Sequence, residues 1–420
     1  MPGVTDIAAH RAIEAIWRIE AARVIGGLAR MVHDVGLAEE LAQDALVLAL
    51  EQWPRTGVPP NPGGWLTSTA KHRAIDLLRR RTVYRRKLAE IGRDVEQAAE
   101  PDLDVELDDY IGDDLLRLIF IACHPVLSAQ ARAALALRLL GGLTAQEIAR
   151  AFLVPEATVA QRIVRAKRTL AAKKIPFELP APAELPDRLS SVLEVLYLIF
   201  NEGYSATGGD DWTRPDLCYE AVRLGRVLAG LMPDEPEVHG LCALMEIQAS
   251  RLRARRGIDG EPVLLADQDR RLWDRLLIRR GLAGLDRAET LGRPVGPYTL
   301  QAAIAACHAG ATSTEDTDWE RIAALYTVLG HLAPGPVVEL NRAVAVGLSA
   351  GPAAGLAIVD RIVAANTLTG YAHLPAVRGD LLAKLGRLDE ARQEFEHAAT
   401  LTANSSEQAL FRQRAATLTS

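Results

Sequence analysis

Aromatic residues make up only 5% of the 420-residue sequence, and cysteine occurs four times. Cys123, Cys218, Cys242 and Cys307 are far apart and form no C-x-x-C pair, which argues against a structural zinc site and a disulfide framework and favours reduced thiols. The sequence also lacks the alternation of Val, Ile and Thr with polar residues that is typical of strands. Because hydrophobic residues nevertheless account for 49% of the chain, we predict an all-α protein with two or three hydrophobic cores.

The sequence contains no N-terminal basic-then-apolar segment and no run of about 18 apolar residues, which a signal peptide or a membrane span would require. We therefore expect a cytoplasmic protein that does not enter a membrane. The net charge of −6 averages over strongly acidic and strongly basic segments, so by itself it predicts no partner.

Residues 143–170, LTAQEIARAFLVPEATVAQRIVRAKRTL, predict two short helices joined by a tight turn. Thr144 and Glu147 form a T-x-x-E capping box that satisfies free amides of the first helical turn. Pro155 stands at the start of the second helix, where a missing amide hydrogen is tolerated. The pattern is typical of a helix-turn-helix, whose second helix enters the DNA major groove. The alternative is an ordinary helical hairpin with a solvated basic face.

The second of these helices separates an apolar face from a basic one. Val159, Ile163 and Ala166 are expected to face inward, together with Ile148 and Phe152 of the first helix. Leu153 departs from the usual pattern, because this turn position often holds glycine. The predicted surface residues are Gln161, Arg162, Arg165, Lys167 and Arg168.

Two further helices are predicted before this motif, at 5–31 and 37–53, separated by Gly36. The segment 54–64 then contains four prolines and three glycines, which predicts a stiff loop rather than a helix. It leads into a strongly basic helix with one apolar side, whose basic content exceeds what solubility requires and favours a polyanionic partner. The predicted apolar side comprises Trp65, Leu66, Ala70, Ile75 and Leu78; the basic residues are Lys71, Arg73, Arg79, Arg80, Arg81, Arg85, Arg86 and Lys87.

Between Asp94 and Asp114 there are ten Asp or Glu residues and no Lys or Arg. We interpret this acidic segment as a flexible linker between two basic modules. In this order the modules resemble the sigma-70 family, specifically the extracytoplasmic-function (group IV) RNA polymerase sigma factors, which keep only regions 2 and 4. The resemblance covers residues 13–81 for region 2 and 113–172 for region 4.

The motifs that carry the resemblance are AEELAQDALVLALEQW (38–53), similar to the polymerase-binding helix of region 2, and GGWLTSTAKHRAIDLLRRR (63–81), similar to its promoter-melting helix. The resemblance implies core RNA polymerase and promoter DNA as partners, no cofactor, no metal and no enzymatic activity. By position, Glu40, Gln43 and Asp44 would bind the polymerase. The −10 element would be read by Asn61, Trp65, Lys71, Arg73, Arg79 and Arg80, and the −35 element by Thr158, Gln161, Arg162, Arg165 and Arg168.

The resemblance divides the chain into region 2 at 5–93, the acidic linker at 94–112, region 4 at 113–174, a proline-rich joint at 175–188 and a helical extension at 189–420. Within the extension, Gly379, Ala391, Phe395 and Ala398 fit the small-small-aromatic-small pattern of a tetratricopeptide repeat. Gly355 and Ala391 are 36 positions apart, near the repeat period of about 34. We expect stacked helical hairpins that bind a small regulatory protein or a ligand.

Two clusters in the extension, FNEGYSATGGDDW (200–212) and DQDRRLWD (267–274), resemble signatures of a sigma-factor subgroup with a tetratricopeptide-like C-terminal extension. In that subgroup the extension is thought to govern activity, and members tend to be encoded beside small YCII-related proteins. An acid–base or metal site is the less favoured interpretation, because Gly203 fits a helix C-cap and Asp267 or Asp269 an N-cap. That site would use Glu202, Asp210, Asp211, Asp267 and Asp269.

The sequence thus leaves three functional hypotheses. The leading one is an alternative sigma factor that directs transcription initiation and is regulated through its helical extension. The second is a stand-alone helix-turn-helix regulator with a repeat-type sensor domain, which leaves the Pro/Gly loop and the basic helix after it unexplained. The third, an enzyme, rests on the acidic clusters alone.

Overall fold

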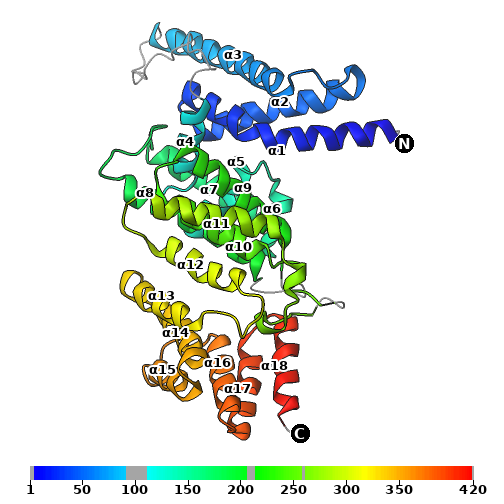
Figure 1. Cartoon of the computed structure of the whole chain (residues 1–420). Coiled ribbons are helices and arrows are strands. Elements are labelled where there is room, and N and C mark those ends of the chain that lie inside the picture. Colours follow the sequence, from blue (N-terminus) through cyan, green and yellow to red (C-terminus); the bar gives the residue numbers. More distant parts are fainter. Residues whose placement is uncertain (1–3, 91–110, 206–212, 258–260, 419–420) are drawn as a thin grey trace. The chain divides into compact units, whose positions relative to one another are not determined.

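A computed structural model describes residues 4–90, 111–205, 213–257 and 261–418. Within these ranges the chain forms eighteen α-helices, two short 3-10 helices and, apart from one isolated bridge between Arg256 and Pro262, no β pairing. The all-α prediction is confirmed. The chain divides into two compact units, Met1–Leu196 and Tyr197–Ser420 (Figure 1). None of the described helices combines the length and the hydropathy of a membrane span.

The first unit begins with three long helices that pack on one another, α1 (Val4–Val32), α2 (Val35–Thr56) and α3 (Pro62–Glu90). Their shared core is rich in small residues, which allows the helices to approach closely: Ala21, Ala38 and Ala70 are all fully buried. At the end of α2, Trp53 is buried and its ring lies edge-on to Trp65 of α3, with 5.3 Å between the centroids. This pair fixes the start of α3 against the end of α2.

The turn between α1 and α2 differs from the prediction. Gly36 does not separate the helices, because α2 already begins at Val35. His33 makes the turn with a left-handed backbone, φ 52°, and the carboxylate of Asp34 caps α2 by accepting a hydrogen bond from the Leu37 amide at 2.9 Å. An aspartate cap after one left-handed residue ends the helix without glycine.

The Pro/Gly-rich segment is also more helical than predicted, since only residues 57–61 are loop. Pro54 lies in the last turn of α2, and Pro62 opens α3 at a position where no amide hydrogen is needed. Gly57, with φ 84°, ends α2, and the side chain of Asn61 accepts a hydrogen bond from the Gly64 amide at 2.9 Å.

Four shorter helices follow, α4 (Ile111–Ala122), α5 (Ala129–Leu139), α6 (Ala145–Phe152) and α7 (Glu156–Ala172). Helix α4 starts one residue before the predicted end of the acidic linker; linker residues 94–110 lie outside the described ranges. Helices α6 and α7 form the predicted pair, and α6 carries the predicted capping box of Thr144 and Glu147. Pro155 precedes the first residue of α7 as its N-cap. The predicted inward face of this pair is buried except at Phe152, which is half-buried.

Leu153 joins α6 to α7 in the left-handed conformation, with φ 48° and ψ 43°. The position therefore has the geometry that usually favours glycine, and the leucine adopts it with a side chain that is 53% exposed. A Cβ in this region of backbone space costs roughly 1–2 kcal/mol.

Helix α8 (Leu185–Tyr204) begins inside the predicted proline-rich joint, so only residues 175–184 are free of regular helix. Its first turns pack on the end of α4. Arg188 donates a hydrogen bond to the Phe120 carbonyl at 2.9 Å, and Ser191 donates one to the Cys123 carbonyl at 2.6 Å. Arg132 of α5, 8% exposed, pairs with Glu194 at 2.9 Å and also contacts Ser191.

The second unit contains the remainder of α8 and two groups of helices. The first group is α9 (Pro215–Leu231), α10 (Pro236–Ala249), the 3-10 turns η1 (Leu265–Asp267) and η2 (Arg270–Leu272), α11 (Arg275–Thr290) and α12 (Pro297–Gly310). Helix α10 packs on α9, α11 and α12. Proline occupies the first turn of α9, α10 and α12, where its fixed φ favours helix initiation.

The second group is α13 (Trp319–Leu332), α14 (Pro336–Ser349), α15 (Pro352–Ala364), α16 (His373–Lys384), α17 (Leu388–Leu401) and α18 (Ser405–Thr417), each packed on the next. Gly355 allows α15 to approach α14, because a Cβ there would lie 2.7 Å from the Ala343 carbonyl oxygen. In the α16–α17 hairpin, Ala391 and Phe395 are buried against Gly379. The predicted helical hairpins are present.

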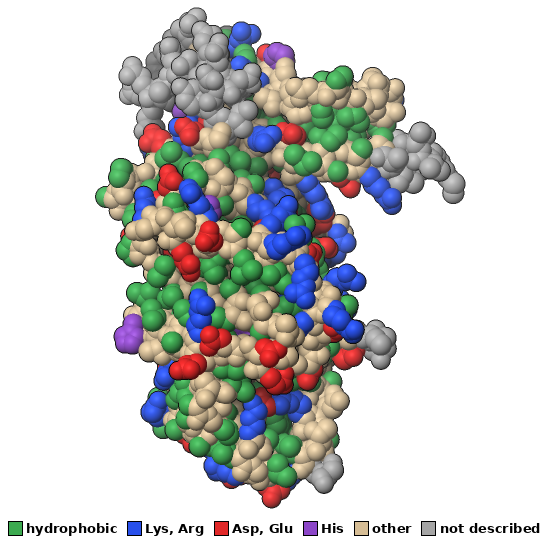
Figure 2. Space-filling view, viewed as in Figure 1, with side chains coloured by type: hydrophobic (Ala, Val, Ile, Leu, Met, Phe, Trp, Pro, Cys, Tyr) green, Lys and Arg blue, Asp and Glu red, His purple; other side chains and the backbone are tan. Residues whose placement is uncertain are grey.

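Acidic and basic side chains are interspersed on the face of the molecule seen in Figure 2, with hydrophobic side chains between them. The net charge of −6 therefore does not form a uniformly acidic surface on this face. Local arrangements of charge, rather than the total, decide which partners the chain attracts.

Replacing Leu153 by glycine should stabilise the α6–α7 turn, because glycine adopts a positive φ without the steric conflict of a Cβ. Part of the gain is lost to the greater freedom of glycine in the open state. We expect amide exchange in α6 and α7 to slow by about two- to fivefold, measured by hydrogen-exchange mass spectrometry on the full chain. Leu153→Ala keeps the Cβ and is the matched control. Equal exchange in the two variants would contradict this account of the turn.

Candidate functional site

The exposed side of α7 carries the five residues predicted for the −35 element. Thr158, Gln161, Arg162, Arg165 and Arg168 recur every three or four positions and so share one side of the helix. Thr158 and Arg162 are half-buried and the other three are exposed. None of the five side chains makes a hydrogen bond or an ion pair with the described residues. Their donors are therefore available to an external partner.

Lys167 was predicted to belong to this exposed face, and that prediction is wrong. Its side chain is 19% exposed and forms an ion pair with Glu39 of α2. The same carboxylate accepts a hydrogen bond from Arg138 of α5, with 2.6 Å between Nε and Oε1. Glu39 is only 3% exposed, so it is a buried acid held between two cations.

Gln43, one turn along α2, donates a further hydrogen bond to the Glu39 carboxylate at 2.9 Å. Removing a buried carboxylate from two cations leaves those charges without a partner, and this is strongly destabilising. The Glu39 cluster, comprising Glu39, Gln43, Arg138 and Lys167, therefore holds α5 and α7 against α2.

Two other ion pairs join the first three helices to the next four. Arg18 of α1 pairs with the capping residue Glu147 of α6. Arg30 of α1 pairs with Asp114 of α4 at 3.2 Å, and Arg117 approaches the same carboxylate at 2.9 Å. Burial raises the pKa of Asp114, while the two arginines act in the opposite direction. In the described structure the two predicted modules are thus packed together rather than separate.

The residues predicted to bind the polymerase lie on α2, where Gln43 belongs to the Glu39 cluster and Glu40 and Asp44 lie beside it. Glu40 and Asp44 are exposed, and Gln43 is half-buried. Asp44 pairs with Arg73 of α3 at 2.6 Å, with side chains 55% and 40% exposed. A pair this exposed contributes little to stability, so either partner can exchange it for an external one.

The residues predicted for the −10 element lie along α3 and the loop before it. Asn61 caps α3, and Trp65 is half-buried against Trp53. Arg79 and Arg80 are exposed and make no ion pair with the described residues, while Lys71 is half-buried. The structure brings these residues together on one helix, except that Arg73 is engaged by Asp44. The side chains of Arg85, Arg86 and Lys87 lie outside the described residues.

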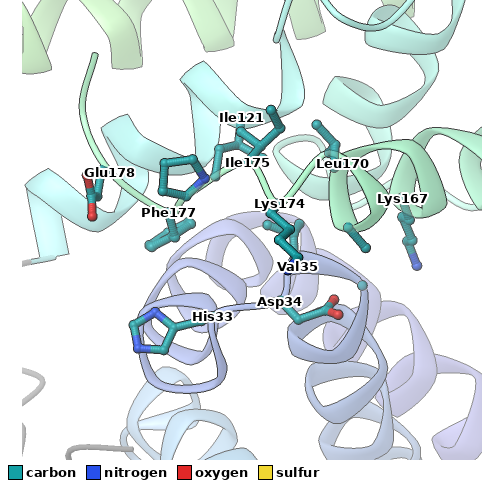
Figure 3. A pocket seen from close by; sticks show the side chains of 13 residues that line it. His33, Asp34, Val35, Ile121, Lys167, Leu170, Lys174, Ile175, Phe177 and Glu178 are labelled. Atoms are coloured by element: carbon teal, nitrogen blue, oxygen red, sulfur yellow. The ribbon is translucent and has the colours of Figure 1, made fainter. Parts of the chain in front are cut away.

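Two grooves run along the junction between the modules, each with a volume of about 510 Å³. One separates the α1–α2 turn from the end of α7; Figure 3 shows Lys167, Leu170 and Lys174 on one side and the turn from His33 to Val35 on the other. The other is lined by Gln43 of α2 and by the first turn of α6. A predicted polymerase-binding residue therefore faces the helix-turn-helix.

Sequence reasoning missed the junction itself. Glu39 is one of several acids in the first turns of α2, next to Glu40, and Arg138 lies within the largely apolar segment ARAALALRLL (131–140). Arginines in an otherwise apolar helix, here Arg132 and Arg138, are a signal of buried polar or acidic partners, although the sequence does not say which.

The described acids of the two clusters in the extension are held by arginines or cap a helix, except Asp267. Glu202 pairs with Arg214, and Asp269 pairs with exposed Arg271 and caps η2. Gly203 is not a C-cap, because it lies inside α8, where a Cβ would come within 2.8 Å of the Arg214 carbonyl oxygen. Asp267 lies within η1 and caps nothing. Asp210 and Asp211 lie outside the described residues. Among the described residues no three His, Cys, Asp or Glu side chains are grouped as metal ligands would be.

Comparison with known proteins gives three family matches. Residues 17–83 match sigma-70 region 2, residues 117–170 match sigma-70 region 4, and residues 188–289 match a family of unknown function, DUF6596. The chain is 47% identical over 395 residues to a Rhizobium meliloti (strain 1021) protein named Uncharacterized protein R00370, covering 93% of this chain and 92% of that protein. No solved structure matches the chain.

The region 2 match falls on α1–α3 and the region 4 match on α4–α7, the two groups of helices whose geometry is described above. Both regions occur in one chain and in the order of a sigma factor. They indicate a transcription factor that binds core RNA polymerase and promoter DNA rather than an enzyme. The chain belongs to the sigma-70 family of sigma factors.

Proposed function

We propose that the chain is an extracytoplasmic-function sigma factor, acting in the cytoplasm, whose C-terminal helical extension regulates transcription initiation. The observation that carries this proposal is the pairing of two compact sigma regions with an extension that is larger than both. The extension's helices are ordered and well packed, so it has the properties of a folded input domain rather than a tail.

In this proposal, Arg162 and Arg165 of α7 contact the −35 element, since their guanidinium groups have no partner among the residues that the structure describes. An arginine bidentate to guanine supplies about 1–3 kcal/mol of discrimination between bases. Arg79 and Arg80 of α3 bind phosphates of the opened −10 strand, which adds affinity but no sequence information. The exposed loop at 57–61 and Trp65 accommodate an unstacked base.

We further propose that the two regions separate when the protein engages a promoter. Elements centred near −10 and −35 are about 25 base pairs apart, roughly 85 Å along B-DNA. In the described structure, Lys167 of the −35 helix contacts Glu39, which is buried on the polymerase-binding helix. Reading both elements at once requires this contact to break, so the packed arrangement opposes promoter binding.

The extension resembles a tetratricopeptide array in its last two hairpins, α14–α15 and α16–α17. Small residues at Gly355 and Gly379 face the partner helix in both, as the pattern requires. Arrays of this kind present a concave surface to a partner. We propose that a regulatory protein or ligand acts there.

Run-off transcription with purified core polymerase tests the sigma assignment and the role of the extension together. We expect a promoter-dependent transcript with the full chain and a changed yield with a chain ending at Leu196, which keeps the contacts of Arg188 and Ser191 with α4. A chain ending at Lys174 loses those contacts and should have a lower melting temperature. Absence of a transcript together with failure to co-elute with core would refute the sigma assignment. Equal yields from the full chain and the Leu196 truncation would refute regulation by the extension.

Alanine at both Gln43 and Asp44 should abolish binding to core polymerase while leaving DNA binding intact, because the change removes no basic side chain and releases Arg73 of α3 from its pair with Asp44. Pull-down on core and DNA gel shift give the two measurements. Glu14→Ala, an exposed acid on α1, is the control with the same charge change. If the unaltered chain binds DNA but does not bind core, the alternative of a stand-alone helix-turn-helix regulator is favoured.

Lys167→Met should increase the apparent affinity for core polymerase by about three- to tenfold, because it weakens the packed arrangement without altering α2. The measurement is a titration of labelled sigma factor with core. Lys173→Met, at an exposed position one residue beyond α7, is the matched control and should not change the affinity. Equal affinities for the two variants would show that the packed arrangement does not compete with the polymerase.

A further inference from the structure

The second unit contains a cavity of about 310 Å³ that the sigma function does not use. It lies among α8, α10, α12, α13 and α14. The two sequence clusters singled out in the extension meet around it. Phe200, Asn201 and Tyr204 of the first line it, and Trp273 of the second lies against Arg251, a residue of the lining.

Arg251 is the main charged group of this cavity. It is 8% exposed, and no carboxylate of the described residues lies within ion-pair distance of it. Its Nη2 donates a hydrogen bond to the Tyr204 hydroxyl at 2.7 Å, while its Nε has no hydrogen-bond partner. The guanidinium carbon lies 5.7 Å from the Tyr204 ring centroid and 5.8 Å from that of Trp273.

The neighbouring arginines are satisfied differently. Arg255 donates to the Tyr204 carbonyl at 2.9 Å and stacks on the Tyr204 ring at 3.7 Å. Arg270 donates to the carbonyls of His308 and Ala311 at 2.6 and 2.7 Å. Backbone carbonyls satisfy donors but do not neutralise charge. The lining of the cavity itself contains no Asp or Glu.

Two further polar groups in the lining have no partner. Gln248 Oε1 and His308 Nδ1 are buried and make no hydrogen bond with the described residues. Burial, followed by the charges of Arg251 and Arg270, lowers the pKa of His308 to about 3, so its imidazole is neutral near pH 7. Buried polar groups are rarely unpaired, and three in one cavity indicate that the site receives something from outside.

Water satisfies unpaired donors but leaves a buried guanidinium without a counter-charge, which an anion supplies. The rest of the lining is mixed: Tyr197, Tyr204 and Tyr326 contribute rings, Leu244 and Ile304 contribute aliphatic side chains, and Asn201, Gln301 and Asn341 contribute amides. A cavity of this size is at the lower end of the range for small-molecule sites, about 300–1,000 Å³.

We propose that this cavity binds a small organic anion, with a carboxylate or phosphate group held by Arg251 and an apolar or planar body lying among the tyrosine rings. Gln248 and His308 complete the polar contacts. The cavity alone carries the binding inference; only its role as an input to transcription rests on the proposed sigma function. Since the lining comes from both helix groups of the second unit, the ligand contacts both at once.

Thermal unfolding of the full chain tests the proposal with three probes, each compared with sodium chloride at equal ionic strength. Benzoate carries a carboxylate on a planar body, benzamide is its uncharged analogue, and inorganic phosphate is an oxyanion without a body. We expect benzoate at ten times its Kd to raise the melting temperature by about 2–5 °C. Benzamide should give no shift. A shift with phosphate but not benzoate assigns the anion as a phosphate group.

Arg251→Met removes the charge and keeps much of the apolar stem, so it should abolish the benzoate shift. Since it also removes a buried charge that lacks an acidic partner, the melting temperature without ligand should not fall. Arg279→Met, the same change at an exposed position of α11, should retain the shift. If Arg251→Met does not fold, Gln248→Met keeps the guanidinium and should weaken the binding of benzoate by about tenfold, measured by titration calorimetry.

No shift with either benzoate or phosphate in the unaltered chain would overturn the proposal, as would an equal shift in Arg251→Met. These outcomes do not depend on transcription. A chain that binds the anion but directs no transcript would refute the sigma assignment and leave the site intact. A chain that directs transcription but binds neither probe would refute the anion site and leave the sigma assignment intact.

Discussion

A buried carboxylate requires cationic partners, and in the first unit Glu39 of α2 obtains them from α5 and α7. Arg138 and Lys167 come from helices more than ninety residues farther along the chain, and both converge on the same acid. Because the pairing is sheltered from water, its loss is costly, so α5 and α7 remain on α2. Helix α7 is consequently divided lengthwise. One side is held by α2 through Lys167, and the other carries Arg162 and Arg165, which make no ion pair with the described residues.

Features encoded by neighbouring residues were predictable from the sequence. The capping box of Thr144 and Glu147 involves two residues three positions apart, and the structure contains it. The packing of Phe395 against Gly379 follows a pattern confined to one hairpin. The all-α fold, the helix-turn-helix and both sigma regions followed from such local patterns. Even Leu153, which looked like a departure, marked the correct position of the left-handed turn.

Features that depend on contacts between distant segments were not predictable in this way. By its position in the sequence, Lys167 cannot be told from the exposed basic residues of α7. It differs from them only because α2 packs beside it and Glu39 pairs with it. Pro54 was predicted to start a loop, but it lies in the last turn of α2. Whether a proline ends a helix at once or is tolerated in its last turn depends on packing that the sequence does not reveal. Glu202 and Asp269 suggested the less favoured acid–base site, yet each pairs with an arginine, Arg214 and Arg271. Those partners lie apart from the acids in the sequence or are common surface pairs, so the sequence did not single them out.

The burial of Glu39 has a consequence for the response to ionic strength. Dissolved salt screens charges in water but has little access to a pair that is nearly enclosed by protein. Binding of the basic helices to phosphates, in contrast, weakens steeply as salt rises, because counterions no longer gain freedom when they leave the DNA. Concentrated salt therefore favours the packed form at the expense of the DNA-bound form. In the proposed function, the ionic strength of the surroundings therefore sets the balance between the packed form and the DNA-bound form.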